Sequence, residues 1–248
     1  KFQEVVLEAP TLGGSSTNAQ IASVHLAPML GAVDLYLAAP GADPVSTVPL
    51  GTLNFTEDLA PAPADALALY IHWPFCVSKC PYCDFNSHVR EGIDVDAWRA
   101  ALLADMGHEA ALTCGRPLSS IFFGGGTPSL MPPTLVADLI AAAERHWGFT
   151  PNIEITLEAN PNSVEAARFA DLAAAGVNRV SLGLQALDNE ALHFLGRAHD
   201  VAEGLAALDT AQSVFDRVSF DLIYARPDQS EAQWQAELAR ALSFGTGH

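Results

Sequence analysis

The chain has 248 residues, half of them hydrophobic, and a formal net charge of −17 at pH 7. This length accommodates one large domain or two small ones with a substantial core. So acidic a chain offers no basic surface to displace counterions from phosphates, which argues against nucleic acid as a partner. No uninterrupted apolar run reaches the roughly 18 residues that are typical of a membrane span.

The first 57 residues differ in composition from the rest and contain one Lys or Arg, which is Lys1. Short β-like runs, separated by Gly, Pro, Ser and Asp, occur at residues 5–9, 21–27, 33–39 and 46–55. We expect a small β-rich segment over residues 1–57. Residues 58–66, DLAPAPADA, follow as a Pro/Ala linker of the semi-extended kind.

From residue 67 onward, apolar strand-like runs alternate with helical periodicity. The strands are expected at residues 67–75, 119–126, 153–161, 179–185 and 217–225. Near-continuous apolar runs that alternate with helices are typical of a parallel sheet buried on both faces. Five such βα units in series predict an α/β fold, either a barrel or an open doubly wound sheet.

The expected helices carry start and stop signals. The first two begin at Asp94 or Asp96, as candidate N-caps, and at Pro133. Asn162 and Glu165 have the spacing of a capping box for the next helix, which we expect to end at Gly176. Two helices follow the fourth strand, near residues 188–195 and 201–215. Apolar residues at i, i+4 and i+8 predict a last helix that contains Trp234, Leu238 and Leu242.

Three cysteines share one short loop directly after the first strand, in CxxxCxxC spacing: Cys76, Cys80 and Cys83. This spacing suits three corners of a [4Fe–4S] cluster and leaves the fourth iron free to bind a cofactor. A zinc site completed by His72 or His88 is the alternative, and a disulfide would strand the third cysteine. The spacing favours the cluster. The fourth cysteine, Cys114, lies in a helical stretch without a partner motif and is expected to be a buried thiol.

Glycines and polar residues stand at the carboxyl ends of the later strands, at residues 124–127 (GGGT), Glu158, Gln185 and Asp221. Taken singly, the glycines fit a tight turn, Glu158 a solvated strand end and Gln185 a cap. Asp221 differs, because a carboxylate within the apolar run FDLIY needs a partner to offset its desolvation. Since the carboxyl ends of barrel strands share one face, we favour a single site beside the cysteine loop.

The glycine run is not a nucleotide-binding loop of a known kind. It has neither the Lys of a GxxxxGKS/T loop nor the GxGxxG spacing. Glycines at a strand end do allow a ligand to approach the backbone closely and to form hydrogen bonds with it. In the open-sheet alternative, the same run would be an anion site.

The runs CVSKCPYCDF, FFGGGTPSL, LEANP, GLQAL and DLIYARP resemble the radical S-adenosylmethionine (SAM) proteins of the oxygen-independent coproporphyrinogen III oxidase-like family. The match is closest to the haem chaperone branch and covers about residues 67–248. It implies a partial (β/α)6 barrel, and a [4Fe–4S] cluster on Cys76, Cys80 and Cys83 whose open iron binds SAM. It also implies a SAM site that comprises Tyr70, Tyr82, Gly125, Gly126, Thr127, Glu158, Gln185, Arg197 and Asp221. In this site the carboxylates suit the SAM ammonium and ribose hydroxyls, and Arg197 suits the SAM carboxylate.

One position bears on function within this family. The oxidases carry a further Cys two residues after the third cluster ligand, where this chain has Phe85. The resemblance therefore implies a haem chaperone of the cytoplasm that binds haem or porphyrin, with a one-electron donor and a haem-acceptor protein as partners. It also implies SAM cleavage in the intact protein. Oxidation of coproporphyrinogen III is the alternative, and a non-enzymatic zinc-binding module is a remote one.

Two features lie outside the resemblance. Residues 1–57 weakly resemble a β-sandwich repeat domain of secreted and surface proteins. The chain starts at Lys1, without Met or a signal peptide pattern, and stops before the last barrel strand that the family implies. We therefore expect the chain to be a fragment.

Overall fold

The structure is a computed structural model that describes residues 32–35, 51–54, 66–90, 92–113 and 115–246. The chain divides between Pro61 and Ala62 into two units, which we describe separately. In the first unit, β1 (Ala32–Leu35) and β2 (Gly51–Asn54) form an antiparallel pair. These strands overlap the β-like runs expected at residues 33–39 and 46–55.

Other expectations for this region stay predictions. The β-like runs at residues 5–9 and 21–27 and the linker at 58–65 lie outside the described residues, and so does Cys114. The boundary of the β-rich segment near residue 57 is therefore a prediction that the described strands do not test.

Five parallel strands form the sheet of the second unit: β3 (Leu67–Trp73), β6 (Leu118–Gly125), β7 (Phe149–Ala159), β8 (Arg179–Gln185) and β9 (Arg217–Leu222). Their spatial order is β3-β6-β7-β8-β9, so each strand lies beside its predecessor in the sheet. A doubly wound sheet reverses its strand order part-way, and this sheet does not. The predicted partial barrel is therefore confirmed over the open doubly wound alternative.

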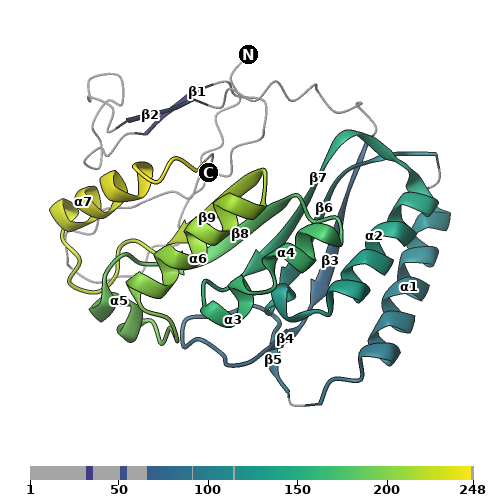
Figure 1. Cartoon of the computed structure of the whole chain (residues 1–248), viewed down its shortest axis with the longest axis horizontal. Helices are drawn as coiled ribbons and strands as arrows, with labels where there is room; N and C mark the ends of the chain where they lie inside the picture. Colours follow the sequence, from purple (N-terminus) through teal and green to yellow (C-terminus); the bar gives the residue numbers. More distant parts are fainter. Residues whose placement is uncertain (1–31, 36–50, 55–65, 91, 114, 247–248) are drawn as a thin grey trace, which may run out of the picture. The chain divides into compact units, whose positions relative to one another are not determined.

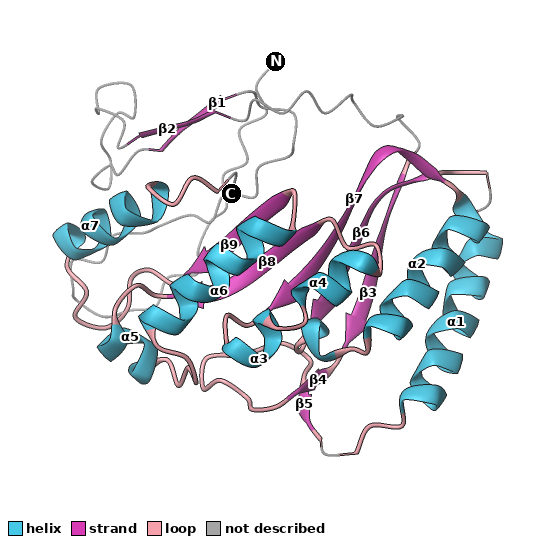
Figure 2. Ribbon diagram, in the orientation of Figure 1, coloured by secondary structure: helices cyan, strands magenta, loops and turns pink. Residues whose placement is uncertain are grey.

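Helices connect the strands and cover the sheet. Those longer than one or two turns are α1 (Val95–Leu112), α2 (Pro133–Trp147), α6 (Val201–Val214) and α7 (Glu231–Leu242). The shorter ones are η2 (Pro128–Leu130), α3 (Ser163–Ala166), α4 (Phe169–Ala174) and α5 (Asn189–Phe194). Figure 2 shows α1, α2, α4 and α6 in a row over one face of the sheet. In Figure 1, the strands point towards the end of the unit where α3, β4 (Phe75–Cys76) and β5 (His88–Val89) lie.

The predicted helix starts are largely confirmed. Asp94, not Asp96, is the N-cap of α1, and its side chain accepts a hydrogen bond from the backbone N–H of Ala97 at 3.0 Å. Pro133 opens α2, where its missing N–H leaves no helical hydrogen bond unmade.

The single helix predicted after Asn162 is wrong, because the structure breaks it into α3 and α4. Asn162 does cap α3 by accepting from the backbone N–H of Glu165, but the Glu165 side chain turns into the interior and does not close the capping box. Beyond the break, the guanidinium of Arg168 donates to the carbonyl of Met131 at 2.7 Å. The side chains of Glu165 and Arg168 thus make tertiary contacts in place of the contacts within one continuous helix that the sequence predicted.

Several strand boundaries also differ from the prediction, and the fifth strand ends at Leu222 rather than at residue 225. The first strand ends at Trp73 because Pro74 cannot donate to the ladder, and Phe75 and Cys76 form a separate short parallel pair with β5. The third strand begins at Phe149, four residues before the apolar run at 153–161. The fourth strand matches its predicted range of 179–185.

The core lies between the sheet and its helical cover. Fully buried side chains of the strands pack against those of α2, and these include Ile121, Phe123, Leu157, Leu182, Leu135 and Leu139. Within the described ranges, we find no helix that is both long and apolar enough to span a membrane.

Candidate functional site

The three motif cysteines lie on the loop that leaves β3, and all three are free thiols. Phe75, next to Cys76, makes edge-on contacts with the rings of Trp73 and Trp98, each with centroids 5.0 Å away. At the far end of the loop, the backbone N–H of His88 donates to the carbonyl of Pro74 at 2.6 Å. Both ends of the cysteine loop are therefore anchored to the barrel.

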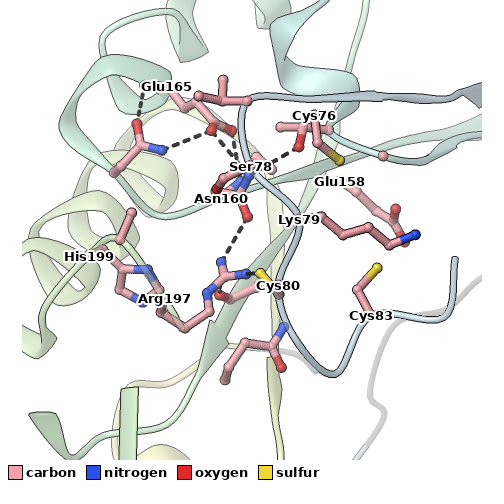
Figure 3. Close-up of a pocket in the computed structure, with 18 of the residues that line it drawn as sticks. Cys76, Ser78, Lys79, Cys80, Cys83, Glu158, Asn160, Glu165, Arg197 and His199 are labelled. Carbon is pink, nitrogen blue, oxygen red and sulfur yellow. Dashed lines mark hydrogen bonds between the residues drawn. The ribbon is translucent and has the colours of Figure 1, made fainter. Parts of the chain in front are cut away.

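A pocket of about 720 Å³ opens at the carboxyl ends of the strands. It brings together the three cysteines with most of the residues predicted for the cofactor site, which are Tyr82, Gly126, Thr127, Glu158, Gln185, Arg197 and Asp221. Figure 3 shows the cysteine loop lying across Glu158, Asn160 and Arg197, with the Cys80 thiol against Arg197. Residues spread over most of the barrel sequence thus share one cavity.

Two predicted residues, Tyr70 and Gly125, stand beside this pocket rather than in its lining. Tyr70 is 56% exposed on β3, and its hydroxyl lies 3.2 Å from Nδ1 of His72. Gly125 donates its backbone N–H to Oε2 of Glu158 at 3.2 Å. Gly125 therefore affects the pocket through the Glu158 carboxylate that it orients, whereas Tyr70 contacts His72 and is not among the lining residues.

The glycine run is fastened to the root of the cysteine loop. The backbone N–H of Gly126 donates to the carbonyl of Trp73 at 2.7 Å, and that of Thr127 donates to the carbonyl of Phe75 at 2.9 Å. A Cβ atom on Gly126 would lie 2.6 Å from the Phe75 carbonyl oxygen. Only glycine therefore permits this approach, which couples the glycine run to the residue before Cys76.

Glu158 and Asp221 form an acidic wall of the pocket. Burial, reinforced by the charge of Asp221, raises the pKa of Glu158 to about 7, although the Gly125 N–H acts in the opposite direction. Desolvation also raises the pKa of Asp221, against the opposing charges of Arg179 and Arg197. The residue is nevertheless exposed on β9, so the buried carboxylate that the apolar run predicted is wrong. Two carboxyl groups that are costly to ionise here are suited to a ligand that brings a cation or hydroxyl donors.

Gln185 ends β8 in a strained conformation, with a φ of 68°. Its carbonyl accepts from the backbone N–H of Ile223 at 2.8 Å, where the register between β8 and β9 shifts. A non-glycine residue in the left-handed region costs about 1 kcal/mol or more, and such residues concentrate at functional sites. This geometry supports a binding role for Gln185 over that of a simple cap.

Asn160, Glu165 and His199 are among the lining residues that were not predicted for the site. Glu165 is 3% exposed, and its carboxylate accepts from the Ser129 hydroxyl, the Asn160 backbone and the side-chain amides of Asn160 and Asn162. Asn160 lies in the run LEANP, so its place in a motif was the available signal. The sequence did not indicate that the Glu165 side chain turns into the interior, because the spacing of Asn162 and Glu165 predicted a capping box.

His199 is buried and its Nε2 lies 3.2 Å from the Leu184 carbonyl, so Nε2 carries the proton. Burial, and then the charge of Arg197, lower the pKa of His199. This imidazole is therefore a neutral part of the pocket wall at pH 7.

The zinc alternative finds little support in this geometry. In the part of the chain that the structure describes, no three His, Cys, Asp or Glu side chains converge as they would on a single ion. Both ring nitrogens of His72 already face partners, at Tyr70 and Asn86, while His88 is exposed on β5. Three free thiols on one loop that line a cavity with polar groups are the donor set that a [4Fe–4S] cluster with an open iron requires.

Comparison with known proteins bears on the same region. Residues 70–241 match the Radical SAM superfamily. "Radical S-adenosyl methionine domain-containing protein 1, mitochondrial" of Bos taurus is 42% identical over 191 residues, which are 76% of this chain and 43% of that protein. "Heme chaperone HemW" of Escherichia coli (strain K12) is 41% identical over 184 residues, which are 73% of this chain and 49% of that protein. The chain spans about half the length of these curated relatives.

Solved structures give the same picture of the fold. The Escherichia coli coproporphyrinogen III oxidase HemN, described as a radical SAM enzyme, is 30% identical with a TM-score of 0.65. That match covers 73% of this chain and 42% of the oxidase. Methylornithine synthase PylB, 12% identical with a TM-score of 0.51, shares the fold alone.

Proposed function

Because this chain belongs to the radical SAM superfamily, whose members use a [4Fe–4S] cluster and SAM, we propose that Cys76, Cys80 and Cys83 hold such a cluster. The observation that carries the proposal is that these free thiols line one pocket with the glycine run and the acidic wall. When bound and reduced, the cluster supplies the electron that cleaves SAM to methionine and a 5′-deoxyadenosyl radical.

The surrounding residues have separate proposed roles toward SAM. Gly126 and Thr127 line the pocket beside the cysteine loop and contact the methionine end of SAM. Their backbone N–H groups already donate to Trp73 and Phe75, so this contact uses other atoms of the two residues. Glu158 accepts a hydrogen bond from the SAM ammonium, and the positive charge of that ammonium favours the ionised form of Glu158. Asp221 and Gln185 bind the hydroxyl groups of SAM. Tyr70, Tyr82 and Gly125 complete the site by contact or by orienting these groups, as Gly125 does for Glu158.

Anaerobic reconstitution with iron and sulfide, followed by EPR spectroscopy of the reduced protein, tests the cluster. We expect about four irons per chain and a reduced-cluster signal, both lost when Cys76, Cys80 or Cys83 is replaced by Ser. Cys114→Ser is the matched control and is expected to keep both. A colourless protein that retains stoichiometric zinc, without an EPR signal, would establish the zinc-binding module instead.

For the biological role, we propose haem binding and delivery to an acceptor protein. Two observations support this over porphyrinogen oxidation: the 41% identity to "Heme chaperone HemW", against 30% to the coproporphyrinogen oxidase, and Phe85 where the oxidases carry a further Cys. The proposed partners are a one-electron donor and a haem-acceptor protein. Since the cysteines must stay reduced to bind iron, the proposed compartment is the cytoplasm.

Haem titration of the full-length protein, followed by absorption spectroscopy, tests this role. We expect stoichiometric haem binding without conversion of coproporphyrinogen III. Turnover of the porphyrinogen would favour the oxidase alternative. Phe85→Cys is an informative variant, because gain of turnover by this change alone would show that the residue separates the two functions.

A further inference from the structure

The guanidinium of Arg197 has four protein partners, from the cysteine loop, the end of β7 and β8. Its Nη1 donates to Sγ of Cys80 and to the hydroxyl of Tyr82, each at 3.3 Å. Its Nη2 donates to Oδ1 of Asn160 at 2.8 Å and to the carbonyl of Gly183 at 3.0 Å. Both terminal nitrogens are thus engaged by protein groups, and one of these groups is a thiol of the cysteine loop.

Asn160 holds this guanidinium in place because hydrogen bonds to Glu165 and Thr127 fix the orientation of the Asn160 amide. Its Nδ2 donates to Oε1 of Glu165 at 3.2 Å and to the Thr127 hydroxyl at 3.3 Å. Rotating the amide by half a turn would aim an NH₂ group at Arg197 and an oxygen at a carboxylate. The buried Glu165 therefore determines that Asn160 presents its oxygen to Arg197.

Glu165, Asn160, Arg197 and Cys80 thus form one line of contacts, which Figure 3 shows running from the interior to the cysteine loop. We propose that this polar relay sets the reduction potential of the cluster through the Arg197–Cys80 contact. Reduction adds negative charge to the cluster, and a guanidinium held against a ligating sulfur stabilises that charge. The relay therefore raises the midpoint potential above the value that the three thiolates alone would give.

This inference rests on the proposed cluster and assigns Arg197 a task separate from holding the SAM carboxylate. Both Nη atoms already have protein partners, so a carboxylate would have to bind at Nε, which is buried without a partner, or displace a protein group from an Nη atom. The two tasks differ in when they act. A contact with SAM changes nothing until SAM is added, whereas the relay acts on the cluster in the absence of SAM.

The test is an EPR-monitored redox titration of the reconstituted chain without SAM. The variants are Arg197→Gln, Arg197→Lys, Asn160→Ala and Glu165→Gln. Arg99→Gln is the matched control, because it removes the same charge from an exposed ion pair with Asp138 on the helical cover. Iron content and far-UV circular dichroism of each variant are measured alongside.

We expect Arg197→Gln to shift the midpoint to a more negative potential, with Arg197→Lys closer to the parent. Asn160→Ala keeps every charge but frees the guanidinium, so it shifts the midpoint in the same direction by less. Glu165→Gln also releases the Asn160 amide, but it removes a negative charge that opposes reduction, so its two effects counteract each other and its shift is smaller still. Arg99→Gln leaves the midpoint unchanged.

Equal midpoints in the parent chain and all relay variants, at equal iron content, would overturn the relay. If Arg197→Gln assembles no cluster, Asn160→Ala decides, because it retains the guanidinium. An unchanged midpoint with weakened SAM binding would leave Arg197 as a cofactor ligand only. Absence of any EPR signal in the parent chain would instead reject the proposed cluster, so the two failures are distinguishable.

Discussion

Glu158 is removed from water beside a second carboxyl group, and its pKa is raised to about 7 as a result. Gly125 N–H supplies a hydrogen bond that offsets part of this cost. Such a residue is unfavourable for the folded state when it is ionised without a cationic ligand. Its position at the end of a barrel strand is therefore better explained by binding than by stability.

This arrangement predicts the pH dependence of stability. Because the folded pKa of Glu158 lies above its unfolded value near 4.5, the folded chain holds an extra proton between those values. Stability is consequently lost as pH rises from about 4.5 to about 7, and it stays low above that range. We expect Glu158→Gln to stabilise the cluster-free protein at pH 8 by on the order of 2 kcal/mol, a value reduced for partial exposure, and to have little effect at pH 5. Urea unfolding at both pH values measures this; equal effects at both would contradict it.

Gly126 makes a second prediction at this scale. In Gly126→Ala, the new Cβ would lie 2.6 Å from the Phe75 carbonyl oxygen, so the glycine run and the cysteine loop must separate. We expect a loss of about 2 kcal/mol in unfolding free energy and a lower iron content after reconstitution. Gly107→Ala, within α1, is the control: nothing lies within 4 Å of the added Cβ, and a gain of about 0.5–1 kcal/mol is expected. Normal iron loading of Gly126→Ala would show that the loop tolerates the displacement.

Elements with strong local signals were predictable from the sequence, and those shaped by tertiary contacts were not. The strand at 179–185 and the helix opened by Pro133 follow from apolar periodicity and backbone chemistry. The break between α3 and α4 depends on where the side chains of Glu165 and Arg168 point in three dimensions. The pairing of β4 with β5 likewise joins residues across the cysteine loop, where the pattern is too short to read.

The attachment of α7 illustrates such a tertiary contact and is testable. Glu237 on α7 accepts from the backbone N–H of Leu187 at 2.7 Å and pairs with Arg226 at 2.6 Å, with both side chains at most 10% exposed. Glu237→Ala leaves a buried guanidinium unpaired, so we expect a loss of about 3 kcal/mol in unfolding free energy. Asp138→Ala breaks the exposed pair with Arg99 and is expected to cost less than about 1 kcal/mol. Similar costs for the two variants, measured in urea, would show that burial of the α7 contact contributes little.

At the scale of the whole molecule, the site is assembled from strand ends that are far apart in sequence. The rule that parallel barrel strands collect their carboxyl ends on one face was enough to predict that the cysteines, Glu158, Gln185 and Asp221 meet. The arrangement of the strand ends does not determine which side chains near those ends line the cavity. Tyr70 and Gly125 therefore fall beside the lining, and Asn160, Glu165 and His199 enter it unpredicted.

The division of the chain between Pro61 and Ala62 gives a prediction at this scale. Among the residues that the structure describes, those that line the pocket lie after this division, on the second unit. We expect residues 62–248 alone to fold with the same midpoint of urea unfolding and to load the same iron per chain as residues 1–248. Reduced iron loading of residues 62–248, at unchanged circular dichroism, would assign residues 1–61 a role in the site.

The sequential strand order also affects how the protein is made. Each barrel strand after β3 joins a partner that the ribosome has already released, so the sheet can grow from its first strand during synthesis. Arg197 follows Cys80 by 117 residues, which at roughly 5–20 residues per second amounts to on the order of ten seconds of translation. The nascent chain therefore carries bare thiols before the residue that covers Cys80 exists. If the proposed cluster forms in the completed pocket, iron is delivered after residue 197 has been made, and the three thiols must stay reduced until then.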